Sequence, residues 1–352
     1  MSALAIKHIF HVHSPLTYYV SELVIKELKI RNEDVIFISD GYKLQRSSNR
    51  RKILFKNSLI KKFLHPNLPK QFDQFIKQEI GEFKFKAYID LPHIPQRILI
   101  THKNCIGFSF IEEGLASYKY SANWEFMTRI SRGITFRTIP FLNLRDLVFF
   151  IRGINSKLLS LPFDPSGYSS FKNVNYFCLS DLAFPLITTG KVNLKSSISY
   201  SSIFILQDLA ENLNGSIIWI EESFARNNAY SAKEYELIIL ITISKLSILP
   251  KDTIYLKLRP KQALEESIAY KTLKSKDINV IIFSHDTILE PYLFFCKNIS
   301  IIGVVSSLLY YATIGNHKVY SQYELFKNIK KPKRSFDDLT FMWDSINCIK
   351  KD

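Results

Sequence analysis

Short apolar runs alternate with helical repeats along the front half of the chain. Apolar residues dominate residues 5–12, and after Ser14-Pro15 they recur with a helical period to about Lys29. A second apolar run covers residues 35–39. Short apolar runs indicate buried strands, whereas recurrence every three to four residues or so indicates an amphipathic helix. The pattern therefore predicts a strand, a helix and a second strand in this order.

The same alternation continues toward residue 111. Further apolar runs at 85–89, 97–101 and 107–111 predict three more strands. Strands that alternate with helices form mainly parallel sheets, because a parallel connection must cross over the sheet. Ligands of such sheets bind beyond the carboxyl ends of the strands. We therefore expect an α/β domain whose functional edge lies there.

A change of composition divides the chain. Residues 163–202 are rich in Ser, Pro, Gly and Asn, which is typical of a crossing between domains. The alternation of strands and helices then begins again. We predict an N-terminal domain over residues 1–200, a C-terminal domain over 201–330, and a final helical segment over 331–352 that packs back on the first domain.

The second half shows the same alternation. Strands are predicted at 202–206, 216–220, 253–258, 279–283 and 299–302, and helices at 232–247, 263–273, 336–348 and from Ser306 onward. Each half therefore predicts a Rossmann-like domain, and two such domains can face each other across a central cleft.

Basic residues exceed acidic ones by a wide margin. The formal net charge is +15, which attracts nucleic acid, anionic lipid and acidic substrates alike. The segment 43–62 holds eight basic residues and no acid: Lys43, Arg46, Arg50, Arg51, Lys52, Lys56, Lys61 and Lys62. Its apolar residues would let it lie on an anionic membrane, and a solvated loop is the alternative. The sequence has no zinc-finger, helix-turn-helix or ribonucleoprotein signature, so we expect no nucleic-acid partner.

Signals for export and membrane insertion are weak. Histidines interrupt the apolar residues between Met1 and His13, so this stretch lacks the long apolar core of a signal peptide. The most apolar stretch, 293–315, contains Lys297, Asn298 and a serine pair, and it predicts buried elements rather than a membrane span. Four scattered cysteines without a CxxC pair suit reduced thiols. We expect a cytoplasmic protein, with a peripheral position on the inner membrane as the alternative.

Two acidic residues precede a glycine at the end of a predicted strand. Glu112 and Glu113 follow the run 107–111, and Gly114 comes next. Adjacent carboxyl groups resist simultaneous ionisation when they are partly buried, which raises one pKa toward that of a working general base. A solvated turn is the alternative for this tripeptide.

Cationic and hydroxyl groups follow the predicted strands of the second half. Lys257, Arg259 and Pro260 lie at the end of one strand. Arginine can bind a phosphate through two parallel hydrogen bonds, but its pKa above about 12 makes it a poor proton donor. A structural ion pair is the alternative for Arg259. Ser306 and Ser307 begin a predicted helix, where hydroxyls and backbone amides can bind an anion, and helix capping alone is the alternative.

Other polar residues are candidates for binding. Glu290 lies between two predicted strands, and a carboxylate can accept hydrogen bonds from both hydroxyls of a ribose. A surface helix position is the alternative. Ser14 belongs to a turn between strand and helix. His11 and His13 occupy alternate positions of the first strand, but no third ligand is evident, so we predict no metal site.

These motifs are similar, in order and spacing, to the signature segments of bacterial sialyltransferases and polysialyltransferases. The similar segments are Phe110-Ile111-Glu112-Glu113-Gly114, Tyr255-Leu256-Lys257-Leu258-Arg259-Pro260 and Gly303-Val304-Val305-Ser306-Ser307, with fainter likenesses at His13-Ser14-Pro15 and Leu289-Glu290-Pro291-Tyr292. The resemblance spans the chain from about His11 to Ala312. It implies the GT-B fold, in which two Rossmann-like domains face a central cleft.

The resemblance also implies roles for residues. The first acid of the pair is the general base in those families and matches Glu112, while Glu113 would support the loop and Gly114 would permit its turn. The serine pair would bind the donor phosphate, and Glu290 would hold the ribose. One segment departs from the pattern, because the families have a histidine where this chain has Arg259. That substitution keeps phosphate binding and loses acid catalysis.

The expected function follows from the resemblance. It is the inverting, metal-independent transfer of sialic acid or a related nonulosonic acid from a CMP-activated donor, without a cofactor. The acceptor would be a glycan or glycolipid of lipooligosaccharide or capsule. Transfer of another CMP-linked sugar such as Kdo is one alternative, because of Arg259. A catalytically inert basic protein that binds a membrane or a polyanion is the other.

Overall fold

The chain divides into two compact units, Met1–Ser197 and Ile198–Asp352. The structure, a computed structural model, describes residues 6–40, 51–55, 74, 76–92, 94–118, 165–169, 171–195, 197, 205–259, 262–285, 287–333, 335–337 and 339–350. Of the basic segment 43–62, only the backbone of residues 51–55 belongs to this set. Pro260 lies outside it.

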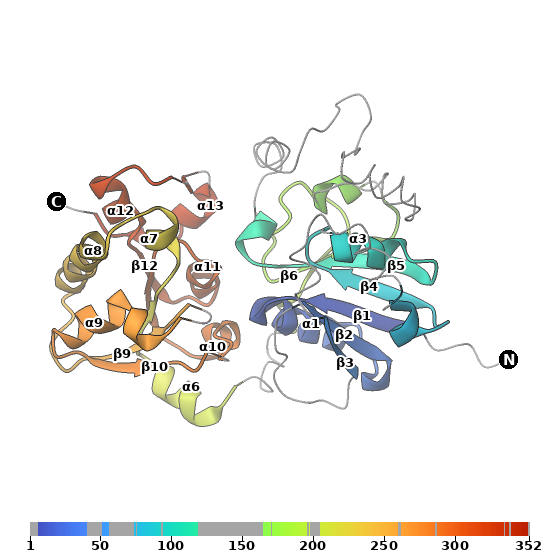
Figure 1. Cartoon of the computed structure of the whole chain (residues 1–352), viewed down its shortest axis with the longest axis horizontal. Coiled ribbons are helices and arrows are strands. Elements are labelled where there is room, and N and C mark those ends of the chain that lie inside the picture. The colour runs from blue at the N-terminus through green and yellow to red at the C-terminus, as the bar shows by residue number, and fades with distance from the viewer. Residues whose placement is uncertain are drawn as a thin grey trace. The chain divides into compact units, whose positions relative to one another are not determined.

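The first unit is built on a seven-stranded parallel sheet with the order β3-β2-β1-β4-β5-β6-β7 (Figure 1). The strands are β1 (Lys7–Val12), β2 (Val35–Asp40), β3 (Arg51–Phe55), β4 (Phe85–Ile89), β5 (Cys105–Ile111), β6 (Asn175–Cys178) and β7 (Lys191–Asn193). Strands predicted at the positions of β1, β2, β4 and β5 are confirmed.

Helices connect the strands of this sheet. The α-helices are α1 (Pro15–Glu27) and α3 (Ile94–Thr101), and short 3-10 helices cover η1 (Asn32–Asp34), η2 (Leu115–Tyr118) and η4 (Pro165–Tyr168). The turn from β1 into α1 is set locally. Ser14 caps the helix by accepting a hydrogen bond from the Thr17 amide at 3.2 Å, and Pro15 supplies a helical φ at the first position.

The strand predicted at 97–101 is wrong, because this segment belongs to helix α3. Its apolar residues Ile98, Leu99 and Ile100 are buried, and a short buried run fits either a strand or a helix. Topology decides between them. β4 and β5 are parallel neighbours, so the chain must cross over the sheet between them, and α3 is that crossover.

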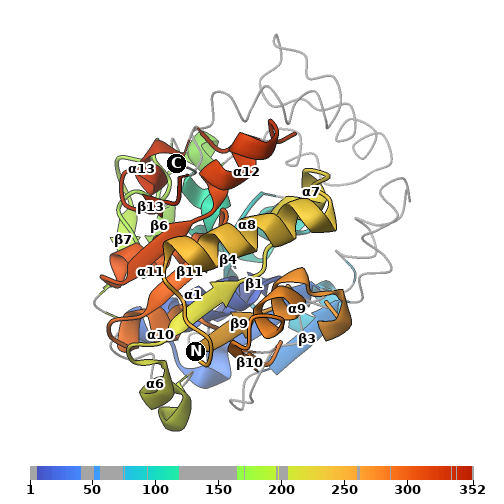
Figure 2. The same cartoon turned by 90° about the vertical axis from the view of Figure 1, so that its left-hand side faces the viewer.

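The second unit contains a six-stranded parallel sheet with the order β10-β9-β8-β11-β12-β13. Its strands are β8 (Ile217–Ile220), β9 (Thr253–Lys257), β10 (Asn279–Ile282), β11 (Ser300–Gly303), β12 (Lys318–Ser321) and β13 (Asn347–Cys348). Helices α6 (Gln207–Leu213), α7 (Phe224–Asn227), α8 (Ala232–Lys245), α9 (Ile268–Lys274), α10 (Glu290–Phe295), α11 (Ser307–Ile314), α12 (Tyr323–Ile329) and α13 (Thr340–Trp343) accompany it, with η6 (Leu264–Glu266) before α9. Helix α8 packs beside α9 and α12 (Figure 2).

One helix prediction and one strand prediction in this unit require correction. The helix expected over 263–273 is interrupted, because Ser267 accepts a hydrogen bond from the Tyr270 amide at 2.9 Å and so starts a new helix, α9. A strand was expected over 202–206. Residues 205 and 206 are not part of a strand and lead into α6, and residues 202–204 are outside the described residues.

The C-terminal segment is also not the single helix expected over 336–348. One helical turn, α13, is followed by β13, which pairs with β12 at the edge of the second sheet. Trp343 stacks on Tyr323 with ring centroids 4.9 Å apart, which fastens the segment to its own unit. Its expected contact with the first domain stays a prediction.

Buried side chains form the interior of each unit. In the second unit, Trp219, Leu256 and Ile302 lie on adjacent strands and pack with residues of α8, α9 and α12. Among the described helices, none has the length and apolar character needed to cross a bilayer.

Candidate active site

The order of the first sheet reverses between β1 and β4. The chain runs from β1 to β2 and β3 on one side, and through β4 to β7 on the other. Parallel sheets bind ligands in the crevice at such a switch point, beyond the carboxyl ends of the strands. His13 directly follows β1, Asp90 directly follows β4, and Glu113 lies two residues beyond β5.

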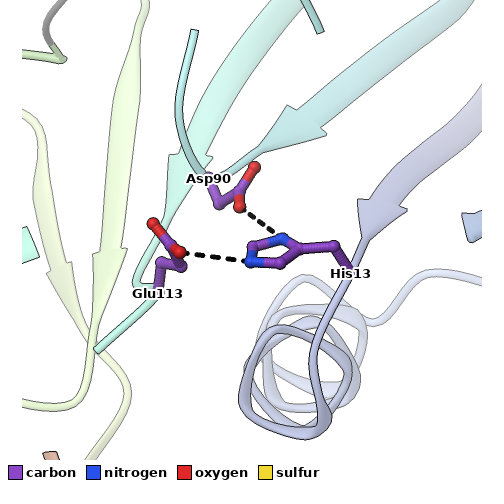
Figure 3. A group of neighbouring side chains, drawn as sticks. All are labelled: His13, Asp90 and Glu113. Atoms are coloured by element: carbon purple, nitrogen blue, oxygen red, sulfur yellow. Dashed lines mark hydrogen bonds and ion pairs between the residues drawn. The ribbon is translucent and has the colours of Figure 1, made fainter. Parts of the chain in front are cut away.

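These three side chains form one cluster (Figure 3). The Nδ1 atom of His13 lies 2.7 Å from Oδ2 of Asp90, and its Nε2 atom lies 3.1 Å from Oε1 of Glu113. The Asp90 side chain is fully buried, whereas 32% of the His13 side chain and 19% of the Glu113 side chain are exposed. The cluster is therefore closed at Asp90, while His13 and Glu113 are partly exposed.

The two carboxyl groups keep His13 charged. Burial lowers the pKa of His13, but the charge of Asp90 and hydrogen bonds to Asp90 and Glu113 outweigh it and raise this pKa to about 11. Burial works against ionisation of Asp90 as well, and its interactions with His13 nevertheless hold its pKa well below the usual range. When both carboxyl groups are ionised, they share one imidazolium, and the cluster keeps one net negative charge.

Gln96 of helix α3 holds the closed end in place. Its Nε2 atom lies 3.2 Å from Oδ1 of Asp90 and 3.2 Å from Nδ1 of His11. All three of these residues are buried. His11, which the alternating pattern grouped with His13, is thus part of the support for Asp90.

Glu112 points into the interior. Its side chain is completely buried, Tyr118 donates its hydroxyl to Oε1 at 2.5 Å, and the Leu179 amide donates to Oε2 at 2.6 Å. The carboxyl group therefore ties the loops after β5 and β6 together. This geometry argues against the predicted role of Glu112 as general base, because a base must reach the proton that it removes.

A tight turn follows Glu112 and Glu113, and local contacts and a glycine stabilise it. The Glu113 amide donates to Oγ of Ser117 at 2.9 Å, and Gly114 has a φ of 100°, a conformation that side chains strongly disfavour. Ser14, predicted as a supporting residue, has its hydroxyl in the cap of α1.

In the second unit, Lys257 and Arg259 contact neighbouring loops. Lys257 donates from Nζ to the carbonyl oxygens of Thr287 at 2.7 Å and Ser284 at 3.2 Å, so it holds the loop before α10. Arg259 donates from Nε to Oε1 of Gln262 at 3.0 Å.

Glu290, Ser306 and Ser307 lie at helix starts. Glu290 begins α10 and is buried, which raises its pKa. Ser306 caps α11 by accepting from the Leu308 amide at 3.2 Å, and Ser307 is the first helical residue. The predicted meeting of Glu112 with Arg259 and this serine pair stays a prediction.

Sequence reasoning missed Asp90 and a second acidic pair. Asp90 could have been found from the sequence, because it directly follows the strand predicted at 85–89. The second pair, Glu221 and Glu222, follows β8 within Ile220-Glu221-Glu222, which repeats the order of Ile111-Glu112-Glu113. Glu221 is buried and accepts hydrogen bonds from the Ser267 hydroxyl and, at 3.2 Å, from the Ile268 amide. This repeated order of residues was the feature of the sequence that could have revealed the second pair.

The cluster could also hold a cation. His13, Asp90 and Glu113 offer ligand atoms that all lie within 4.8 Å of one another. The described geometry already accounts for both ring nitrogens of His13, since each contacts a carboxylate oxygen. A metal would have to replace at least one of those contacts.

Two solved structures resemble the chain in fold. The co-structure of MnaA from S. aureus with UDP has a TM-score of 0.50 and 12% identity, and the match covers 90% of this chain and 79% of that chain. The UDP-GlcNAc 2-epimerase from Methanocaldococcus jannaschii has a TM-score of 0.50 and 11% identity, with 99% and 89% covered. These likenesses concern the fold, which is α/β of the GT-B type with two Rossmann-like domains.

The family follows from the sequence. The model of the family described as alpha-2,8-polysialyltransferase matches residues 91–321. The chain belongs to this family, and it is a sialyltransferase-like glycosyltransferase. Comparison with curated proteins gives no match.

Proposed function

We propose that the protein transfers sialic acid or a related nonulosonic acid from a CMP-activated donor to a hydroxyl group of a glycan, with inversion and without a metal. The observation that carries this proposal is the His13 imidazolium between Asp90 and Glu113 at the switch point of the first sheet. Family membership supports the class of reaction.

Glu113, rather than Glu112, acts as the general base in this proposal. Its side chain is partly exposed, unlike the buried side chain of Glu112, and the contact with His13 fixes the direction of its carboxyl group. Asp90 compensates the imidazolium charge, so Glu113 can accept the proton of an acceptor hydroxyl. Fixed geometry of this kind lowers the entropic cost of reaching the reactive arrangement.

The donor phosphate would be bound by the second unit. Arg259 supplies a positive charge for the departing CMP, and Ser306 and Ser307 supply hydroxyl and amide groups. Lys257 shapes the adjoining loop, and Glu290 accepts from the ribose hydroxyls. Since a phosphate is a weakly basic leaving group, electrostatic stabilisation can replace proton donation here, and no metal is required.

The proposed acceptor is a glycan or glycolipid of lipooligosaccharide or capsule at the cytoplasmic side of the inner membrane. The net charge of +15 supports peripheral contact with anionic lipid. Under this proposal the membrane is the location of the acceptor, and nucleic acid is not a partner.

A donor panel tests the proposal. The purified chain is incubated with a lactoside and with CMP-sialic acid, CMP-Kdo or UDP-GlcNAc, and nucleotide release and glycoside product are measured with and without EDTA. We expect CMP-sialic acid to be used, with EDTA having no effect and with inversion at the anomeric carbon of the product. Use of CMP-Kdo alone establishes the alternative donor.

The inert-protein alternative has its own outcome. If no donor reacts and CMP does not raise the melting temperature, the transferase proposal is overturned. Binding to anionic vesicles by such a protein, with strong salt dependence, would then assign it to the membrane-binding class.

A further inference from the structure

The second sheet also reverses its order, between β8 and β11. The chain runs from β8 to β9 and β10 on one side, and through β11 to β13 on the other. A ligand of this sheet is therefore expected beyond the carboxyl ends of β8 and β11. Glu222 lies two residues beyond β8 and reaches the turn after β11.

Glu222 occupies an anion site made by the backbone. Its Oε1 atom accepts from the Val304 amide at 2.7 Å, and its Oε2 atom accepts from the Val305 amide at 2.8 Å. Consecutive amides that point at one anion are also how proteins hold phosphate groups. The preceding Gly303 allows the close approach, because a Cβ added there would lie 2.7 Å from Oε1 of Glu222.

The surroundings of the Glu222 carboxyl group disfavour its negative charge. Burial raises the pKa of Glu222 to about 7, although both amide hydrogen bonds oppose the shift. Nearby charged and titratable groups are Glu221 on the same turn, Tyr235 on α8 and Arg259 after β9. Burial raises the pKa of the Tyr235 phenol, and the charges of Glu221, Glu222 and Arg259 also act on this pKa, which places these three charged groups near Tyr235.

We propose that Glu222 is an exchangeable occupant of the phosphate site in the second unit: its carboxylate holds the Val304 and Val305 amides until the phosphate of a nucleotide donor takes them. This inference rests on the proposed function and deepens it. Two anions cannot share these amides, so Glu222 swings aside or becomes protonated when the phosphate binds. Glu222 thereby sets the affinity for the donor and for the CMP product.

Calorimetric titration of the full chain tests the exchange. The probes are CMP, inorganic phosphate and cytidine, and the variants are Glu222→Gln and Glu222→Ala. Removing the competing anion should tighten binding of CMP and phosphate about tenfold, because a hydrogen-bonded charge is being displaced. Cytidine, which lacks a phosphate, should bind all three proteins equally.

A matched control separates this effect from net charge. Glu236→Gln removes one charge at an exposed position of α8 in the same unit and should leave every affinity unchanged. Unchanged or weaker phosphate binding in the folded Glu222 variants would overturn the proposal and make Glu222 a fixed brace of the turn.

A measurement on the wild type covers the case in which the variants do not fold. Sulfate, whose charge is constant near pH 7, is titrated in two buffers of different ionisation enthalpy. Exchange predicts that the number of bound protons changes during sulfate binding near pH 7: protons are released if Glu222 swings into solvent, and they are taken up if Glu222 becomes protonated in place. Sulfate binding without a change in bound protons, or no sulfate binding, contradicts the proposal.

The outcomes distinguish this inference from the proposed function. If CMP binds no better than inorganic phosphate while both Glu222 variants tighten phosphate binding, the CMP donor is wrong and the exchange stands. If CMP binds well to the wild type but the variants show no gain, the exchange is wrong and the donor stands.

Discussion

At the scale of residues, the direction of one side chain decides which acid can take part in chemistry. Glu112 and Glu113 are neighbours, yet Glu112 is buried inside the first unit, whereas Glu113 is partly exposed and contacts His13. Consecutive side chains at a strand end point to opposite sides. The sequence predicted the pair and its position at a sheet edge, but not which member faces outward.

Loss of the Glu112 charge should mainly affect stability. In Glu112→Gln, the amide group cannot accept from both Tyr118 and the Leu179 amide, and one buried donor loses its partner. We expect the free energy of unfolding to fall by about 2 kcal/mol. Urea denaturation monitored by circular dichroism measures it. Unchanged stability would show that these two hydrogen bonds do not hold the loops.

The His13 cluster should make stability depend on pH. The pKa of His13 is raised from 6.5 to about 11 in the folded chain, so its pairing stabilises fully below about pH 6.5 and is lost as the pH rises toward 11. The difference in unfolding free energy between wild type and His13→Asn should therefore shrink between pH 6.5 and 9.5, or thereabouts. Denaturation at several pH values measures it.

A residue that does not titrate serves as the control. Ser244 is an exposed residue of α8, and Ser244→Ala should give a difference that stays constant over the same range. A His13→Asn difference that also stays constant would show that the imidazolium is not charged through its two carboxylate partners.

At the scale of elements, the apolar pattern predicted β1, β2, β4, β5 and β8 to β11, and it missed β3, β6, β7, β12 and β13. β7 and β13 have three residues or fewer, which is too short for a period to emerge. β6 and β7 also lie inside the segment that its Ser, Pro, Gly and Asn content assigned to a domain crossing. Helix α3 was mistaken for a strand because only the sheet order shows that a crossover is needed there.

Helix α8 depends on its cap. The Ser231 hydroxyl accepts a hydrogen bond from the Glu234 amide at 3.2 Å, and the Glu234 carboxylate accepts one from the Ser231 amide at 2.6 Å. Ser231→Ala should lower the free energy of unfolding by about 1 kcal/mol. Ser244→Ala, at an exposed position in the last turn of the same helix, should not lower it, since alanine is the better helix former. Equal loss in both variants would contradict the capping role.

At the scale of the whole molecule, both sheets place acidic residues at their switch points. The first presents Glu113 beside an imidazolium, and the second presents Glu222 on two amides. These local sites follow from strand order together with side-chain contacts, which no short motif encodes. The sequence motifs predicted the family and the fold class, and coordinates were needed to show that Asp90 and Glu113 contact His13 and that Glu222 contacts two amides.

The net charge of +15 should give salt-dependent contact with membranes. We expect the chain to sediment with vesicles that contain anionic lipid, and this binding should weaken at least about tenfold when salt rises from roughly 0.05 to 0.5 M. Vesicles of neutral lipid are the control and should not bind it. Binding that ignores both salt and lipid charge would contradict an electrostatic contact.

The proposed function requires Glu113 to act as the general base of the glycosyl transfer. The most direct measurement is the turnover of CMP-sialic acid with a lactoside by wild type, Glu113→Gln and Glu112→Gln, together with their affinity for CMP. We predict that Glu113→Gln lowers kcat by about a hundredfold or more with CMP affinity kept, whereas folded Glu112→Gln keeps kcat within about tenfold. Full turnover by Glu113→Gln would contradict the account.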